Sequence, residues 1–156
     1  MCKFLVVFFL FISCNFAFSQ KELDINQKNA KQAVLDFFEG FHKGDTAQIG
    51  KTILNMDMAL QTVFKNKEGK VKTNTTKIKE FMEAIHNRPE DQKWLEKLLD
   101  FRIDADERIA QIWTPYEFYV NDQFSHCGVN IFQLFNDGIS WKIIAIADTR
   151  KRKGCK

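Results

Sequence analysis

Three side chains in the second half of the chain could carry out acid–base chemistry. Glu117 and Asp148 supply carboxylates and His126 supplies an imidazole, the groups that transfer protons near neutral pH. A carboxylate beside an imidazole could also hold one metal ion, and the same groups could form a hydrogen-bonded surface that is solvated or buried in a dimer. These alternatives stay open, because they depend on which residues share a face of the folded chain.

The three residues belong to a larger polar set that we expect on the outer face of a sheet. The set also contains aromatic residues, which are enriched in protein–protein contacts and therefore favour a dimer interface. We call it the predicted outer cluster, and its members are Trp113, Glu117, Tyr119, His126, Asn130, Asp148 and Arg150.

Sequence motifs of several enzyme classes are absent. The chain has no Gly-x-Gly-x-x-Gly, phosphate-binding loop, Gly-x-Ser-x-Gly, His-Glu-x-x-His or Cys-x-x-Cys. His126 and Cys127 are neighbours, but adjacent residues of a strand point to opposite faces, which argues against a catalytic pair. We therefore expect no cofactor and no metal, and we leave open whether the protein is an enzyme.

Composition and charge exclude two broad classes of protein. The 156 residues carry 23 Lys+Arg and 20 Asp+Glu, a net charge of +3 that is too balanced for a dedicated nucleic-acid binder. With 45% hydrophobic and 28% charged residues, the chain is not intrinsically disordered. We expect one folded domain with a basic C-terminal tail, residues 150–156.

The first 19 residues have the pattern of a secretory signal peptide. A positive start precedes nine apolar residues, 4–12, and small residues follow before Gln20. We expect cleavage between Ser19 and Gln20 and export of the domain, residues 20–156, to the periplasm or the medium. The apolar run is shorter than the roughly 20 residues that cross a bilayer, so we expect no stable membrane insertion. Lipoprotein processing at Cys14 is the second possibility.

Two cysteines remain after the predicted cleavage. Export permits a disulfide between Cys127 and Cys155, but nothing in the sequence requires one. Two free thiols are the reading we favour, with Cys127 acting as a small buried hydrophobic residue.

The first half of the chain is predicted to be mainly helical. Asp24 and Gln27 have capping-box spacing, and an apolar stripe at helical spacing follows them. The predicted elements are a helix from Asp24 to Gly44, a short helix from Asp45 to about Leu54, a strand over 59–65, a turn over 66–69 and a third helix from Thr75 or Thr76 to Pro89.

The second half is predicted to form an antiparallel meander. Apolar and polar residues alternate in four segments, 99–105, 108–120, 125–135 and 141–149, whereas 92–98 receives no assignment. Helices followed by such strands indicate an α+β fold, in which N-terminal helices pack on the sheet.

Turn positions decide which strand residues are neighbours. We expect a two-residue turn over 106–107, a loop over 121–124 and an odd-length loop centred on Gly138. These turns predict the pairs Phe101–Ile112, Tyr119–His126, Phe118–Cys127, Glu117–Gly128, Phe135–Trp141 and Gly128–Asp148. A two-residue turn at Asp137–Gly138 would reverse the faces of the last strand, so the positions of Asp148 and Arg150 stay open.

This pairing divides the strands into two faces, and the apolar face must lie under the helices. Even-numbered residues of 110–118 and odd-numbered residues of 127–135 then face the helices, while His126 faces away. On the inner face we predict a ligand pocket. Its lining residues are Phe41, Tyr116, Phe118, Val129, Ile131, Gln133 and Thr149, of which Tyr116, Gln133 and Thr149 would orient the ligand.

Several segments together resemble the nuclear transport factor 2-like (NTF2-like) superfamily, and in particular its small exported bacterial members labelled lumazine-binding. The segments are Phe38-Glu-Gly-Phe-His-Lys-Gly-Asp45, Trp113-Thr-Pro-Tyr-Glu-Phe-Tyr119, His126-Cys-Gly-Val-Asn130, Trp141-Lys-Ile143 and Asp148-Thr-Arg150. The resemblance covers most of residues 24–152. It implies a cone, in which a strongly curved antiparallel sheet wraps the helices around a pocket, and often a homodimer through the outer sheet face.

The resemblance favours binding over catalysis. The acid that steroid-isomerase-like members use on this strand aligns near Ile131, which cannot transfer a proton. We therefore expect an exported protein that binds a small apolar or aromatic molecule. The alternatives are a cofactor-independent isomerase, dehydratase or hydrolase of the polyketide cyclase-like type that uses Glu117, His126 or Asp148, and a purely structural dimer module.

Overall fold

The computed structural model describes residues 22–155, so the predicted signal peptide, its cleavage site and Cys14 lie outside the described residues. The described part contains three helices and seven strands. They are α1 (Ile25–Lys43), α2 (Thr46–Thr52), β1 (Ala59–Lys65), β2 (Val71–Lys77), α3 (Ile78–His86), β3 (Trp94–Leu98), β4 (Arg102–Ala105), β5 (Ile109–Val120), β6 (Gln123–Asn136) and β7 (Trp141–Arg150).

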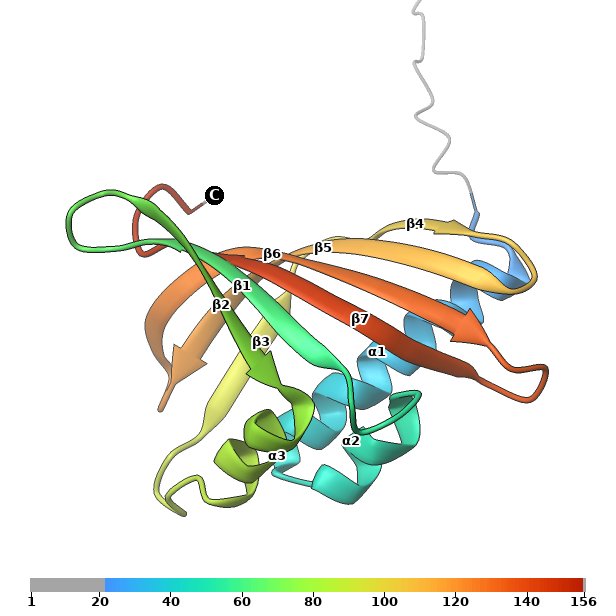
Figure 1. Cartoon of the computed structure of the whole chain (residues 1–156), viewed down its shortest axis with the longest axis horizontal. Coiled ribbons are helices and arrows are strands. Elements are labelled where there is room, and N and C mark those ends of the chain that lie inside the picture. Colours follow the sequence, from blue (N-terminus) through green and yellow to red (C-terminus); the bar gives the residue numbers. More distant parts are fainter. Residues whose placement is uncertain (1–21, 156) are drawn as a thin grey trace, which may run out of the picture.

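A single curved sheet forms one layer, and the helices lie against its concave side (Figure 1). The strand order is β2-β1-β7-β6-β5-β3, with β4 also paired to β5. All neighbouring pairs are antiparallel except β1 and β7, which run parallel. The predicted α+β class, with N-terminal helices on a curved sheet, is confirmed.

The helix caps predicted from sequence are present. The backbone N–H of Gln27 donates to the Asp24 carboxylate (2.9 Å), and the Asp24 N–H donates to the Gln27 side chain (3.1 Å). Gly44 ends α1 with φ of 75°, a left-handed conformation that glycine adopts without strain. The Asp45 carboxylate caps α2 by accepting from the Gln48 N–H (2.9 Å).

The core lies between α1 and the concave side of the sheet. The apolar stripe of α1 places the rings of Phe37 and Phe38 6.2 Å and 5.9 Å from the ring of Phe132 on β6. Phe37 also stacks on Phe81 of α3 at 6.0 Å. The helix stripe predicted from its spacing is therefore the main contact between the two layers.

Two strands were not predicted. Residues 71–77 form β2, an exposed edge strand paired with β1, so the third helix begins at Ile78 rather than at Thr75 or Thr76. Apart from Val71, which is 63% exposed, the residues of β2 are polar and show no apolar alternation, because an edge strand buries little of either face. The unassigned segment 92–98 contains β3, which pairs with the end of β5.

The predicted register between β5 and β6 is wrong by one residue, because the hairpin contains a bulge. Asn121 and Asp122 form a two-residue turn with φ of 52° and 62°. This turn is two residues shorter than the predicted loop over 121–124, so by itself it would not change the face to which each side chain points. Ser125 is then an extra residue in β6, so that Phe118 pairs with His126 instead of Cys127. Every β6 side chain beyond this bulge points to the face opposite to the one predicted.

Burial confirms the reversed faces of β6. Phe132 and Leu134 are completely buried against the helices, whereas Ile131 and Phe135 are 40% and 39% exposed on the convex side. The prediction that odd-numbered residues of 127–135 face the helices, with His126 facing away, is therefore wrong.

A second bulge reverses only the far half of β7. Trp141 and Ile143 are buried, as predicted, but Ile144 is an extra residue between the pairs Leu134–Ile143 and Gln133–Ala145. Beyond it, even-numbered residues face the helices, and Asp148 pairs with Asn130 instead of Gly128.

Between β4 and β5 the register differs from the predicted one by two residues, with Ile103 opposite Ile112, which leaves the faces as predicted.

The C-terminal tail folds back onto β6. The backbone groups of Cys127 and Lys151 exchange two hydrogen bonds of 2.9 Å, and a disulfide joins Cys127 to Cys155 with a Cα–Cα distance of 6.0 Å. The expectation of two free thiols is wrong. Cys127 is buried, but beneath the tail rather than in the main core.

Within residues 22–155 no helix combines the length and apolarity that a membrane span requires.

The disulfide should contribute measurably to stability. It closes a loop with a sequence separation of 28 residues, for which the loss of unfolded-chain entropy corresponds to about 3–4 kcal/mol. We expect Cys155→Ser to lower the free energy of unfolding by about 2–4 kcal/mol in urea titrations. Reduced wild-type protein, the matched control, should unfold at nearly the same urea concentration as this variant. Equal stability of oxidised wild type and variant would show that the tail is not bonded in solution.

Candidate functional site

A row of polar side chains crosses the concave side of the sheet. Thr62 on β1 is opposite Asp148 on β7, Asp148 is opposite Asn130 on β6, and Asn130 is opposite Thr114 on β5. All four are buried. Polar groups in such a position need hydrogen-bond partners, because an unpaired buried polar group is costly. We define the concave cluster as Thr62, Glu96, Tyr116, Asn130, Asp148 and Arg150.

Asp148 is the centre of the concave cluster. Its carboxylate accepts hydrogen bonds from the hydroxyls of Thr62 (2.6 Å) and Tyr116 (3.1 Å) and from Nε of Arg150 (2.8 Å). The Tyr116 hydroxyl also lies 3.1 Å from the carbonyl oxygen of Thr149. Burial, and then the nearby carboxylates, raise the pKa of Tyr116, so this hydroxyl stays protonated and donates.

Gly128 makes room for Tyr116. A Cβ at this position would lie 1.7 Å from the Thr149 carbonyl oxygen and 2.9 Å from the Tyr116 ring. Only a residue without a side chain lets β7 and the tyrosine ring approach β6 this closely.

Glu96 approaches the cluster from β3. Its Oε1 accepts a hydrogen bond of 2.6 Å from the side-chain amide of Asn130. Burial raises the pKa of Glu96 to about 7, opposed by the Asn130 hydrogen bond and reinforced by the charge of Asp148. A carboxyl group with this pKa can both take up and release a proton near neutral pH.

His126 lies on the same side of the sheet, against aromatic rings. Its ring centroid is 4.9 Å from that of Phe118 and 5.8 Å from that of Tyr116. Burial, and then the positive charge of Arg150, lower the pKa of His126 to about 4. The imidazole is therefore neutral at neutral pH, and Ser125 Oγ lies 3.1 Å from its Nδ1.

The predicted outer cluster does not exist as one unit. Trp113, Glu117 and Tyr119 do lie on the outer side, where the Tyr119 hydroxyl donates to Glu117 (2.7 Å) and the guanidinium of Arg102 lies over the Trp113 ring (4.4 Å). The other four members, His126, Asn130, Asp148 and Arg150, are on the concave side because of the two bulges.

The predicted pocket lining is also divided. Phe41, Tyr116 and Phe118 line the concave side as predicted. Val129, Ile131, Gln133 and Thr149 belong to the alternate positions of β6 and β7, and the hydroxyl of Thr149 accepts from the Val129 N–H (3.1 Å). The reason is again the extra residue in each strand.

Sequence reasoning missed Thr62 and Glu96. Thr62 could have been found only from the parallel pairing of β1 with β7, which no local pattern predicts. Glu96 lies in the segment that received no assignment, and its partner Asn130 is 34 positions away. Among residues 22–155, no three His, Cys, Asp or Glu side chains come together as a metal ion would require.

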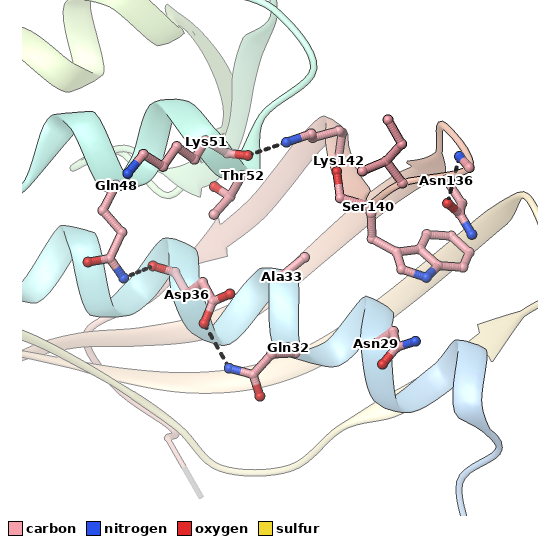
Figure 2. Close-up of a pocket in the computed structure, with 13 residues that line it drawn as sticks. Asn29, Gln32, Ala33, Asp36, Gln48, Lys51, Thr52, Asn136, Ser140 and Lys142 are labelled. Carbon is pink, nitrogen blue, oxygen red and sulfur yellow. Dashed lines mark hydrogen bonds between the residues drawn. The ribbon is translucent and has the colours of Figure 1, made fainter.

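A separate groove of about 650 Å³ lies between α1, α2 and the β6–β7 turn (Figure 2). It contains none of the predicted site residues. Most of its lining residues are of polar type, and the full set is Asn29, Gln32, Ala33, Asp36, Gln48, Lys51, Thr52, Asn136, Gly138, Ile139, Ser140, Trp141 and Lys142.

Comparison with known proteins identifies the fold. No protein-family model and no curated protein matches the chain. An NTF2-like protein of unknown function from Shewanella baltica is 14% identical, with 85% of this chain and 100% of that one covered and a TM-score of 0.56. An NTF2-like protein from Cytophaga hutchinsonii is 12% identical, with 81% and 100% covered and a TM-score of 0.62.

A third similar structure is an NTF2-like protein with a cystatin-like fold from Novosphingobium aromaticivorans. It is 10% identical, covers 83% of this chain and 84% of its own, and has a TM-score of 0.62. At such identities the likeness concerns the fold alone, and this chain has the NTF2-like fold. The further resemblance to members labelled lumazine-binding stays a prediction.

The close approach at Gly128 can be tested by adding one methyl group. The new Cβ of Gly128→Ala would collide with backbone, so we expect a loss of about 3 kcal/mol or more in the free energy of unfolding. Gly50→Ala in α2 is the matched control, because its nearest neighbour is the Met82 methyl at 3.9 Å. Alanine is the better helix former, so this control should be unchanged or stabilised by up to about 1 kcal/mol. Wild-type stability of Gly128→Ala would contradict the described contact.

The raised pKa of Glu96 predicts how stability depends on pH. Because the folded protein holds this proton more tightly, stability falls as pH rises from 4.5 to about 7 and stays reduced above it. Glu96→Gln removes this loss and can still accept from Asn130. We expect the variant to gain about 1–3 kcal/mol relative to wild type between pH 4.5 and 7.5 in urea titrations.

The lowered pKa of His126 acts in the opposite direction. The stability it contributes is lost as pH falls from 6.5 to about 4. The His126 contribution is the same in wild type and in Glu96→Gln, so it cancels when their free energies of unfolding are subtracted. Glu90→Gln makes the same change at an exposed loop position and is the control for the loss of one carboxyl group. A difference between Glu96→Gln and wild type that does not change with pH would contradict the burial of the Glu96 carboxyl group.

Proposed function

We propose that this protein binds a small molecule with an apolar or aromatic body and a polar end on the concave side of the sheet, beside Arg150. The observation that carries this proposal is the ion pair between Arg150 and Asp148. The arginine side chain is 50% exposed, whereas the aspartate is only 9% exposed. A buried carboxylate thus holds an exposed guanidinium in place by its Nε.

The remaining N–H groups of the Arg150 guanidinium can face a ligand. Among the hydrogen bonds formed within residues 22–155, Arg150 uses only Nε. Its two terminal nitrogens are therefore free to donate to a carboxylate or carbonyl group, for which the planar guanidinium is well suited.

Aromatic side chains supply the apolar part of the proposed site. The ring of Phe118 lies 4.9 Å from His126, 6.2 Å from Phe41 and 6.3 Å from Trp94, measured between centroids. Aromatic side chains beside a few fixed polar groups, here the Arg150 guanidinium and its partner Asp148, favour an aromatic or apolar ligand.

Export and dimerisation belong to the same proposal. The disulfide supports an oxidising compartment such as the periplasm or the medium. The convex face carries the exposed apolar residues Ile131 and Phe135, together with Ile109 at 56% exposure, which supports a homodimer through this face. Nucleic acid and membrane remain outside the proposed partners.

A second candidate function is cofactor-independent acid–base catalysis by an isomerase, dehydratase or hydrolase. The specific observation in its favour is the pKa of about 7 for Glu96, which would replace Glu117 as the proton-transfer group. This candidate requires a bound substrate on the same concave side, so a binding test precedes any test of activity.

The binding proposal is tested with 2-naphthoate, an aromatic carboxylate, and by native mass spectrometry of protein purified from its own host. We expect saturable binding of 2-naphthoate, and about 10–100-fold weaker binding by Arg150→Gln, because a charge-assisted contact is lost. Lys153→Gln, another single-charge change in the tail, is the control and should bind normally. Absence of both a co-purified ligand and naphthoate binding would favour a purely structural dimer module.

A further inference from the structure

The groove beside the β6–β7 turn has two walls of different origin. Asn29, Gln32 and Asp36 lie three or four residues apart on α1 and therefore share one face of that helix. Figure 2 shows them across the groove from Asn136 and Ser140 of the turn region. The short side chain of Ala33, between the polar residues of α1, gives the groove its depth.

Several lining side chains are fixed by contacts to one another. The Gln32 amide donates to the Asp36 carboxylate (2.7 Å), and the Gln48 amide donates to the Asp36 backbone carbonyl (3.1 Å), as Figure 2 shows. Lys142 Nζ donates to the Lys51 carbonyl (2.5 Å) and so joins the start of β7 to α2. These bonds leave the Gln32 side-chain oxygen and one Asp36 oxygen as acceptors.

Other lining groups have no protein partner. Among the hydrogen bonds formed within residues 22–155, none uses the Asn29 amide, the Ser140 hydroxyl or the indole N–H of Trp141. Every buried side-chain nitrogen or oxygen of this part of the chain is paired. The Trp141 N–H is therefore not fully enclosed, although the residue as a whole is only 6% exposed. The groove thus offers donors and acceptors side by side above an apolar floor.

The charge of the groove limits the class of ligand. Asp36 opposes Lys51 and Lys142, and the ammonium group of Lys142 already donates to a carbonyl. The groove therefore lacks the concentrated positive charge that selects phosphate or nucleic acid. Alternating donors and acceptors match hydroxyl groups, each of which donates and accepts. Trp141 and Ala33 are only 6% and 9% exposed, so the groove offers small apolar patches to the C–H groups of a sugar ring rather than a stacking face.

We propose that this groove is a carbohydrate-binding site that takes a neutral saccharide of one or two rings. Its volume of about 650 Å³ lies within the range of small-molecule sites. The Asn29 amide, Ser140 hydroxyl and Trp141 N–H donate to the sugar hydroxyls, while Gln32 and Asp36 accept from them. This site shares no residue with the proposed site at Arg150, so each can be tested separately.

The test uses maltose, cellobiose and diacetylchitobiose with the full domain, read by saturation-transfer NMR and by tryptophan fluorescence. We expect at least one disaccharide to bind saturably with a Kd of about 0.1–10 mM. The double variant Asn29→Ala/Ser140→Ala removes exposed or partner-free groups and should fold normally, but should weaken binding about tenfold or more. Trp141→Phe should abolish the fluorescence change.

Two controls make the result specific. Gln111→Ala removes an exposed amide from the outer face of β5 and should bind the disaccharide like wild type. Arg150→Gln should also bind it normally, even where naphthoate binding is lost. No saturable binding of any of the three disaccharides up to about 50 mM would overturn the proposal, and so would equal binding by the Asn29/Ser140 double variant.

Discussion

Two extra residues, Ser125 in β6 and Ile144 in β7, determine which side chains face the helices. Without the first, Phe132 and Leu134 would point to solvent and the phenylalanine stripe of α1 would lose its partner. Without the second, Asp148 would leave the concave side. A bulge also bends a strand and increases its twist, so the same two residues contribute to the curvature that lets one sheet wrap the helices. The core and the concave cluster therefore have a common origin.

The concave cluster places charge where the fold would otherwise be apolar. Asp148 is tolerated there because two hydroxyls and a guanidinium surround it. Glu96 has only the Asn130 amide as a hydrogen-bond donor, and burial raises its pKa to about 7. The two carboxyl groups thus differ in their environment. Asp148 is paired with the cationic guanidinium of Arg150, whereas Glu96 is paired with the neutral amide of Asn130. Such differences between neighbouring acids are typical of sites that bind or convert a ligand.

Local patterns in the sequence predicted local structure well. The caps at Asp24 and Asp45 and the apolar stripe of α1 depend on residues within one or two helical turns, and all were confirmed. The α+β class followed from helical segments that precede alternating ones, and the faces of β5 followed from its alternation. The faces of β6 did not, because Ser125 is an ordinary strand residue that nothing nearby marks as extra. The site depends on long-range pairing, such as Thr62 with Asp148 and Glu96 with Asn130, and such pairs have no local signature.

The bond between Cys127 and Cys155 makes the C-terminal part of the chain a covalent ring. That ring contains Asp148 and Arg150 of the concave cluster and also the β6–β7 turn that borders the groove. Ile139, at the tip of this turn, is 95% exposed and offers a protease an accessible peptide bond. Hydrolysis there would add one water molecule and open the backbone without releasing a fragment, because the disulfide would hold the two pieces together until a reductant separated them.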